Sequence, residues 1–307
     1  MRIPHPMQYQ GSKRSLAPLI LKYLPSGMDR LVEPFAGSAA ISLACAARGR
    51  ARQFWLNDAN APLAALLREI IRNPIGIADA YESLWAEQEQ ETIAHFYRVR
   101  DEFNTSRDPA RLLYLLARCV KGSVRYNSDG LFNQSPDKRR RGTRPHTMRE
   151  NLFGVSAILR DRTVITALDY KNVLAEVTRE DVVYMDPPYQ GVCNDRDPRY
   201  FASVLAADFV SALADLNERG VRFAVSYDGR TGDKTFGPSL PSNLDLTLIE
   251  LEAGRSSQAT LLGRNAETVE SLYLSRPLAE EVCAMPIVHR RTTARQLTLL
   301  ETRARYG

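Results

Sequence analysis

The sequence predicts an α/β fold in which a helical and basic insertion, residues 62–160, interrupts a single sheet. A strand–turn–helix–strand order over residues 30–58 is the building element of a parallel sheet. Apolar residues at helical spacing then continue to about residue 120. Strand-type runs return after residue 160 and recur up to residue 274. The segments on either side of the insertion are therefore expected to share one sheet.

Each element before the insertion has a local signal. The first helix carries apolar residues at helical spacing and is stopped by Pro25, and the second is built of small residues that can pack closely on a sheet. The expected elements are a helix over 15–24, a strand over 30–33, a turn over 34–38, a helix over 39–48 and a strand over 53–56.

The insertion begins with helix signals and ends with turn signals. Asn60 is the expected N-cap of its first helix, which Pro74 ends. Residues 127–130, Asn-Ser-Asp-Gly, are typical of a hairpin turn. Further helices are expected near 76–88, 91–104 and 109–120. After the insertion, strands are expected over 164–166, 182–185, 222–226, 244–251 and 268–274, with an amphipathic helix over 208–219.

Composition excludes several classes of protein. No apolar run approaches the roughly 18 residues of a membrane span, and the N-terminus lacks a signal-peptide core. We therefore expect a cytoplasmic protein that does not enter a membrane. The cysteines show no paired spacing and the histidines are scattered, so we expect reduced thiols and no metal site. Nothing in the sequence indicates an oligomeric state.

The most informative motif is Asp186-Pro187-Pro188-Tyr189, which follows a buried apolar strand. Two prolines end the strand and hold a carboxylate and a phenol on a rigid turn at the sheet edge. The carboxylate and the first proline's carbonyl can accept the two hydrogens of an exocyclic amine, while the ring stacks on the tyrosine. The motif therefore favours a nucleobase amine as substrate, although an ordinary turn would use the same residues.

A second motif points to a cofactor. The turn over 33–38 follows the first strand, and Gly37 and Ser38 permit close approach of a ligand to the backbone and to the next helix N-terminus. Asp58 ends the second strand, where a carboxylate can bind two ribose hydroxyls. The glycines required beneath a pyrophosphate are absent. An adenosine cofactor without phosphates fits better than a dinucleotide, although an ordinary strand–helix turn remains the alternative.

Positive charge is concentrated inside the insertion. The net charge is +5. A polar, turn-rich stretch between Lys121 and Arg149 carries a dense cluster of lysines and arginines. Such a block is typical of a loop that contacts phosphates, and a solvated charged surface is the alternative. Its members are Lys121, Arg125, Lys138, Arg139, Arg140, Arg141, Arg144 and Arg149.

Taken in order, the motifs resemble those of the D12-class (Dam-type) N6-adenine DNA methyltransferases, over about residues 7–275. The resemblance is carried by residues 9–13, 33–37, 57–60, 98–104, 125–133 and 186–189. It implies a Rossmann-like, S-adenosylmethionine-dependent methyltransferase sheet with an inserted helical and hairpin DNA-recognition domain. The implied parts are a catalytic and cofactor domain (1–61 and 161–276), a target-recognition domain with a basic β-hairpin (62–160) and a C-terminal tail (277–307).

The resemblance also implies roles for individual residues. Asp186 and the Pro187 carbonyl would accept hydrogen bonds from N6 of an adenine flipped out of double-stranded DNA, and Tyr189 would stack on it. Pro188 completes the catalytic turn. The implied cofactor-binding residues are Tyr9, Lys13, Glu33, Phe35, Ala36, Gly37, Ser38, Asp58, Asp169 and Asp186. The expected DNA-binding residues are Lys121, Arg125, Asn127, Asn133, Lys138, Arg139, Arg140 and Arg141.

The recognition segment departs from the GATC-specific members of the family. Those enzymes carry an aromatic residue and a leucine where this chain has residues 120–124, and a lysine where it has Gln8. We therefore do not expect GATC as the target. N4-cytosine methylation, a catalytically inactive DNA-binding regulator and, least favoured, a dehydrogenase are the alternatives. A cognate restriction endonuclease is a candidate partner.

Overall fold

The computed structural model describes residues 3–88, 91–188, 206–231, 234–236, 239–255 and 267–284. One sheet has the strand order β3-β2-β1-β4-β5-β8-β7, with β6 paired to β5. The strands are β1 (Met28–Glu33), β2 (Ala51–Asn57), β3 (Thr163–Thr166), β4 (Asp181–Met185), β5 (Arg222–Thr231), β6 (Lys234–Phe236), β7 (Thr247–Arg255) and β8 (Glu267–Leu274). The single α/β sheet expected from the sequence is confirmed.

The strands on either side of β1 determine where a ligand can bind. β3, β2, β1, β4 and β5 pair in parallel, whereas β8 pairs antiparallel with both β5 and β7. The chain leaves β1 toward β2 on one side and returns later to add β4 on the other. This reversal is the Rossmann-type switch point, where ligands bind outside the carboxyl ends of the strands.

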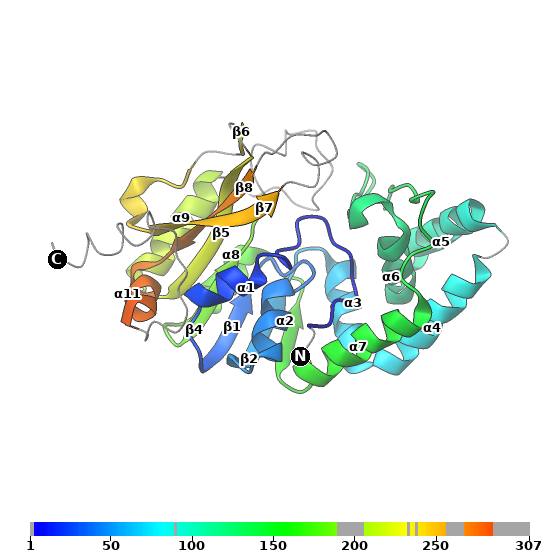
Figure 1. Cartoon of the computed structure of the whole chain (residues 1–307), viewed down its shortest axis with the longest axis horizontal. Helices are drawn as coiled ribbons and strands as arrows, with labels where there is room; N and C mark the ends of the chain where they lie inside the picture. The colour runs from blue at the N-terminus through cyan, green and yellow to red at the C-terminus, as the bar shows by residue number, and fades with distance from the viewer. Residues whose placement is uncertain are drawn as a thin grey trace.

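Helices cover both faces of the sheet (Figure 1). Alternate residues of β1 belong to different hydrophobic clusters: Leu31 packs with α1, α2 and α11, and Val32 packs with α8 and α9. Every residue of β4 is buried, as expected for a central parallel strand covered on both faces. The flanking helices are α1 (Ala17–Ile20), α2 (Ala40–Ala47), α8 (Tyr170–Glu176), α9 (Ala206–Glu218) and α11 (Arg276–Ala284).

The insertion forms a helical body beside the sheet (Figure 1). Its central helix is α6, whose residues 112–116 have no exposed surface and pack with α3, α4 and α5. Asn60 accepts a hydrogen bond from the Leu63 N–H as the N-cap of α3, as expected. The helices are α3 (Ala61–Arg72), α4 (Pro74–Glu87), α5 (Thr92–Ser106), α6 (Pro109–Arg118) and α7 (Pro145–Leu159).

α7 was not predicted from the sequence. Its buried residues Met148, Leu152, Val155 and Leu159 recur at helical spacing and pack with α3 and α4. The clustered cations before and within this segment favoured a loop in the sequence analysis, which grouped Arg149 with the basic loop and missed the helical spacing. The structure instead places Arg149 on α7, where its guanidinium pairs with the carboxylates of Asp79 and Glu82.

The expected β-hairpin over 125–133 is a tight loop closed by isolated bridges, not a pair of regular strands. Tyr126 and Phe132 form one antiparallel bridge, and Cys119 and Pro136 form another. The Asn127 side chain accepts hydrogen bonds from the N–H groups of residues 129 and 131. Side-chain and backbone hydrogen bonds thus replace a strand ladder here. None of the described helices is both long and apolar enough to cross a membrane.

The buried side chain of Asn57 connects the ends of three strands. Its amide group donates to the carbonyl oxygens of Pro34 (2.9 Å) and Leu168 (3.0 Å). Its own oxygen accepts from the Leu168 N–H (2.8 Å) and the Thr166 hydroxyl (2.7 Å). All four hydrogen-bonding positions of the amide are therefore used, and the loops that follow β1, β2 and β3 are held together.

We predict that Asn57→Ala lowers the free energy of unfolding by about 2–4 kcal/mol, because it leaves several buried polar groups without partners. Denaturant unfolding monitored by circular dichroism measures the change. Gln53→Ala is the matched control, since Gln53 lies on the same strand with an exposed side chain. Equal stability of the two variants would contradict the role assigned to Asn57.

Candidate active site

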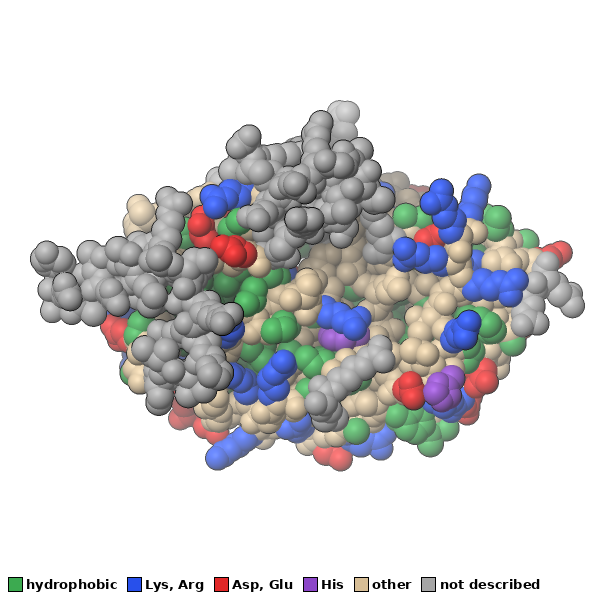
Figure 2. Space-filling model, viewed as in Figure 1, with side chains coloured by type: hydrophobic (Ala, Val, Ile, Leu, Met, Phe, Trp, Pro, Cys, Tyr) green, Lys and Arg blue, Asp and Glu red, His purple; other side chains and the backbone are tan. Residues whose placement is uncertain are grey.

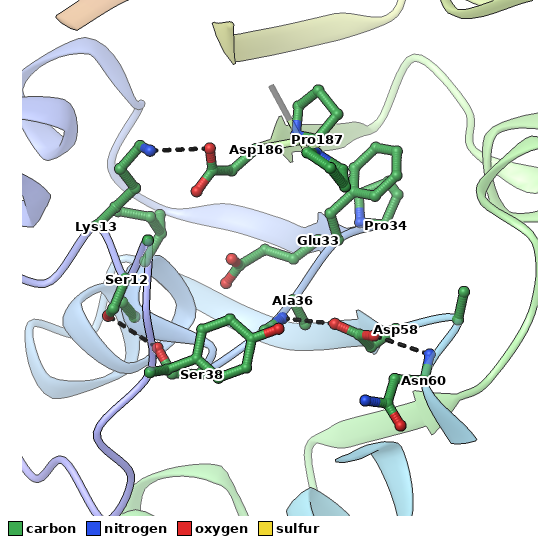
Figure 3. A pocket seen from close by; sticks show the side chains of 18 of the residues that line it. Ser12, Lys13, Glu33, Pro34, Ala36, Ser38, Asp58, Asn60, Asp186 and Pro187 are labelled. Atoms are coloured by element: carbon green, nitrogen blue, oxygen red, sulfur yellow. Dashed lines mark hydrogen bonds and ion pairs between the residues drawn. The ribbon is translucent and has the colours of Figure 1, made fainter. Parts of the chain in front are cut away.

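A pocket lies at the carboxyl edge of the sheet, where β1 and β4 diverge (Figure 3). Its walls are the segment over 9–13, the turns after β1, β2 and β4, and the start of α8. Of the residues expected to bind cofactor or substrate, it is lined by Tyr9, Lys13, Glu33, Phe35, Ala36, Gly37, Ser38, Asp58, Asp169, Asp186, Pro187 and Pro188. Tyr189, the expected stacking residue, lies outside the described residues.

Asp58 is fixed by two backbone hydrogen bonds. One carboxylate oxygen accepts from the Gly37 N–H (2.9 Å) and the other from the Asn60 N–H (2.9 Å). Burial raises the pKa of Asp58, and these two N–H groups act in the opposite direction. Each carboxylate oxygen has about two acceptor positions. Asp58 therefore keeps capacity to accept two further hydrogen bonds from ligand hydroxyls.

Gly37 is required by the close approach of Tyr9. The residue has a φ of +51°, and a Cβ there would lie 3.0 Å from the Tyr9 ring. A larger residue would displace the tyrosine ring that lines the pocket. Beside it, the hydroxyls of Ser12 and Ser38 are 2.9 Å apart, which joins the N-terminal segment to the turn after β1 (Figure 3).

Glu33 forms the inner wall of the pocket. Its side chain is buried, and one carboxylate oxygen accepts from the Ser42 N–H at the start of α2 (2.7 Å). Burial raises the pKa of Glu33 to about 7, against the effect of the Ser42 hydrogen bond. This carboxylate satisfies one of the free N–H groups that the first turn of a helix presents.

The motif that begins at Asp186 meets the N-terminal segment through an ion pair. The Lys13 ammonium lies 3.0 Å from Asp186 Oδ1 and 3.6 Å from Glu270 Oε2 (Figure 3 draws the first contact). Burial raises the pKa of Asp186 to about 6, and Lys13 moderates the rise. The Lys13 side chain is only 7% exposed, whereas an ordinary lysine at a sequence position like this would be expected on the surface.

Two aromatic rings form part of the pocket wall, which we call the aromatic wall. Phe35 packs against Tyr170 with ring centroids 5.2 Å apart, and both line the pocket. The Tyr170 hydroxyl is buried and has no hydrogen-bond partner among the described residues. An apolar ring surface with an unsatisfied polar atom suits a purine, so the residues present fit the adenosine part of the expected cofactor. Asp169 also lines the pocket, and its side chain caps α8 by accepting from the Lys171 N–H.

Two residues of this site were missed by sequence reasoning. Tyr170 follows Asp169 directly but carried no motif signal of its own. Glu270 lies on β8, far along the chain from every matched motif. Only the pairing of β8 beside β5 brings its carboxylate to Lys13, so no local pattern could have indicated it.

The expected DNA-binding residues differ in burial and position. Lys138, Arg139, Arg140 and Arg141 are exposed, and Figure 2 shows Lys and Arg side chains over the helical insertion. Asn127 and Asn133 belong to the tight loop, with Asn133 exposed. The half-buried Arg125 has an Nε without a hydrogen-bond partner among the described residues. The side chain of Lys121 lies outside the described part of the structure.

Buried polar side chains hold the backbone of the basic loop. The Arg118 guanidinium donates to the Asp137 carbonyl (3.2 Å) and the Tyr81 hydroxyl donates to the Thr143 carbonyl (2.6 Å). Gln88 donates to the Arg141 carbonyl (3.1 Å). These hydrogen bonds hold the backbone of the basic loop against the helical body, while the cationic side chains of residues 138–141 are exposed to solvent.

The residues that lead into the tight loop, 122–126, contact the segment that lines the pocket. The Gln10 N–H donates to the Gly122 carbonyl (3.1 Å), and the Ser123 hydroxyl donates to the Gln10 side chain. The Tyr126 hydroxyl donates to the Asn60 side chain (3.2 Å), and Val124 lines the pocket itself. The insertion and the pocket are therefore in direct contact.

Comparison with known protein families identifies the family to which this chain belongs. The D12 class of N6 adenine-specific DNA methyltransferases matches residues 9–256, which include the pocket, the insertion and the motif at Asp186. The chain belongs to this family. The described residues contain no cluster of three His, Cys, Asp or Glu side chains that could hold a metal ion.

Individual members of the family are similar over large parts of the chain. The DNA adenine methylase of Serratia marcescens is 31% identical over 188 residues, which are 60% of this chain and 66% of that protein. The DNA N-6-adenine-methyltransferase of Escherichia phage P1 is 26% identical over 72% of this chain and 29% of its own length. Modification methylase StsI of Streptococcus sanguinis is 24% identical over 83% of this chain and 40% of its own length. This chain thus covers less than two thirds of each of these relatives.

Gly122 offers a test of the contact between the insertion and the segment that lines the pocket. It has a φ of +61°, and a Cβ there would lie 2.4 Å from the Gln8 carbonyl oxygen. We predict that Gly122→Ala lowers the free energy of unfolding by about 1–3 kcal/mol more than backbone strain alone would. Cofactor affinity should also fall, because the displaced segment carries Tyr9 and Lys13.

Gly130→Ala is the matched control. Gly130 has a φ of +71° with no atom within 4 Å of the added Cβ, so it carries the same strain without the clash. Thermal melting and calorimetric titration with S-adenosylmethionine compare the two variants. Equal affinity in both would show that the loop does not support the pocket.

Proposed function

We propose that the protein transfers a methyl group from S-adenosylmethionine to N6 of an adenine flipped out of duplex DNA. The observation that carries the proposal is the position of Asp186. Its carboxylate lies at the end of β4 in the same pocket as Asp58 and the aromatic wall. An acceptor for an amine thus stands beside a site that suits an adenosine, within a chain that belongs to an adenine-specific family.

The cofactor supplies an activated methyl group on a sulfonium, so the protein contributes binding, orientation and electrostatics. Asp58 would accept hydrogen bonds from the ribose hydroxyls, since both its oxygens retain acceptor capacity. Phe35 and Tyr170, which pack against each other, would offer ring surface to the adenine. Tyr9 and Lys13, both on the N-terminal segment, would lie against the methionine part.

The target amine requires acceptors, because the lone pair of adenine N6 is delocalised into the ring. Asp186 Oδ1 is paired with Lys13, which leaves Oδ2 to accept one N6–H bond while the Pro187 carbonyl accepts the other. These bonds favour a pyramidal nitrogen whose lone pair faces the methyl group. As the new C–N bond forms and the C–S bond breaks, the amine loses one proton, and the Asp186 carboxylate is the adjacent acceptor.

DNA binding is assigned to the helical insertion as the target-recognition domain. The exposed cations over 138–141 would contact phosphates without reading sequence. Arg125 is the candidate base reader, because arginine forms two hydrogen bonds with guanine and its side chain is half-buried at the start of the tight loop. We retain a cognate restriction endonuclease as a candidate partner, since one relative is a modification methylase, and the cytoplasm as the place of action.

Asp186→Ala should abolish methyl transfer while cofactor affinity changes by less than about threefold, because Asp186 is assigned to the target amine. The assay incubates labelled S-adenosylmethionine with duplex DNA and separates the nucleosides after digestion. Label in N6-methyl-2′-deoxyadenosine supports the proposal for the unaltered protein. Label in N4-methyl-2′-deoxycytidine, or tight DNA binding without transfer, would overturn it in favour of the corresponding alternative.

Replacing Lys138, Arg139, Arg140 and Arg141 together by alanine should weaken binding to cognate and scrambled duplexes alike. The slope of log affinity against log salt concentration should flatten by nearly one unit for each phosphate that is no longer neutralised. Fluorescence anisotropy at several salt concentrations measures both effects. Arg276→Ala, on the exposed surface of α11 far from the insertion in Figure 1, is the control. An unchanged slope would show that the basic loop does not contact DNA phosphates.

A further inference from the structure

Lys13 is shared between two carboxylates that come from different parts of the chain. Asp186 belongs to the catalytic turn, whereas Glu270 belongs to β8. A buried ammonium is costly unless it is paired and hydrogen-bonded. Both carboxylate side chains are 20% exposed and Lys13 is 7% exposed, so the pair with Glu270 is not an ordinary surface ion pair.

The approach of β8 to β5 delivers Glu270 to this position. Glu270 lies opposite Gly229, at an irregularity in the pairing between Ser226 and Gly229. A Cβ at Gly229 would lie 2.8 Å from the Val269 carbonyl oxygen, so a larger residue would push β8 away. β5 is also the parallel neighbour of β4, whose end carries Asp186. The sheet therefore fixes the distance between the two carboxylates independently of any ligand.

We propose that Glu270 is a positioning residue for methyl transfer, which anchors the Lys13 ammonium so that Lys13 holds Asp186 Oδ1 and leaves Oδ2 for the target amine. This inference rests on the proposed function of the site. Without Glu270, the Lys13 ammonium would lose one of its two carboxylate partners among the described residues and could move over both oxygens of Asp186. Asp186 Oδ2 would then be shared with the Lys13 ammonium and would accept less well from the target amine.

The charges around Asp186 give the inference a measurable signature. Among the described residues, the charged and titratable groups around Asp186 are Lys13 from the N-terminal segment, Glu270 from β8, Glu33 from β1 and Tyr184 from β4. Burial raises the pKa of Asp186, Lys13 lowers it, and the negative charge of Glu270 raises it further. An ionised Asp186 is needed as acceptor, so activity is present above this pKa and is lost as the pH falls through about 6.

The test is Glu270→Gln, which keeps the shape of the side chain and removes its charge. We expect kcat to fall between about tenfold and a hundredfold, because the reacting groups are misplaced, with KM for S-adenosylmethionine changed less than twofold. The acidic limb of the kcat–pH profile should move to lower pH. Glu270→Asp retains the charge and should keep the limb of the unaltered protein with part of its activity.

Two controls separate positioning from stability. Glu250→Gln removes a carboxylate from the neighbouring strand β7, where it pairs with Arg230 on the surface, and should change neither kcat nor the pH profile. In a Lys13→Met background, Glu270→Gln should lower kcat less than twofold further, because Glu270 acts through Lys13.

The inference is overturned if Glu270→Gln retains the kcat and the acidic limb of the unaltered protein. It is also overturned if the variant shows lower cofactor affinity and a lower melting temperature while the acidic limb of its kcat–pH profile is unchanged. An unaltered protein that transfers no methyl group to any duplex would instead refute the proposed function, and this inference with it.

Discussion

Four hydrogen bonds of the buried Asn57 side chain hold the loops from which the pocket is built. They join the carbonyl of Pro34, at the start of the turn after β1, to the chain at Thr166 and Leu168 after β3. The next residue, Asp58, binds the backbone of that same turn at Gly37. Backbone hydrogen bonds from the Ala36 N–H to the Asn57 carbonyl and from the Asp58 N–H to the Thr166 carbonyl also join these strand ends. The Asn57 amide adds the side-chain bonds that hold the Pro34 and Leu168 carbonyls in place.

The carboxylates of the pocket are each held by a protein partner. Glu33 satisfies a helix N-terminus, Asp58 satisfies two loop N–H groups, and Asp186 is paired with Lys13. Each carboxylate is thereby fixed before any ligand arrives, which lowers the entropic cost of orienting it when a ligand binds. Among the described residues, Glu270 adds a second negative partner for Lys13.

The helical insertion is connected to this pocket by direct contacts. The segment that carries Tyr9 and Lys13 also carries Gln10, which binds Gly122 and Ser123 of the insertion. A displacement of Gly122 and Ser123 would therefore be transmitted to the residues that line the pocket. The backbone of residues 137–141 is held separately by Arg118 and Gln88, so the exposed cations there stand on a preformed surface.

The sequence by itself determined the parallel strands, most of the helices and the residues at the strand ends, because β-branched runs, caps and prolines act locally. Asp58 and Asp186 were found this way, since each directly follows a strand and the carboxyl ends of parallel strands share one edge. Tertiary structure alone decided the burial of Lys13, the partner-free hydroxyl of Tyr170 among the described residues and the approach of Glu270. These depend on which strands are neighbours in the sheet, and β8 reaches β5 only through pairing between residues distant along the chain.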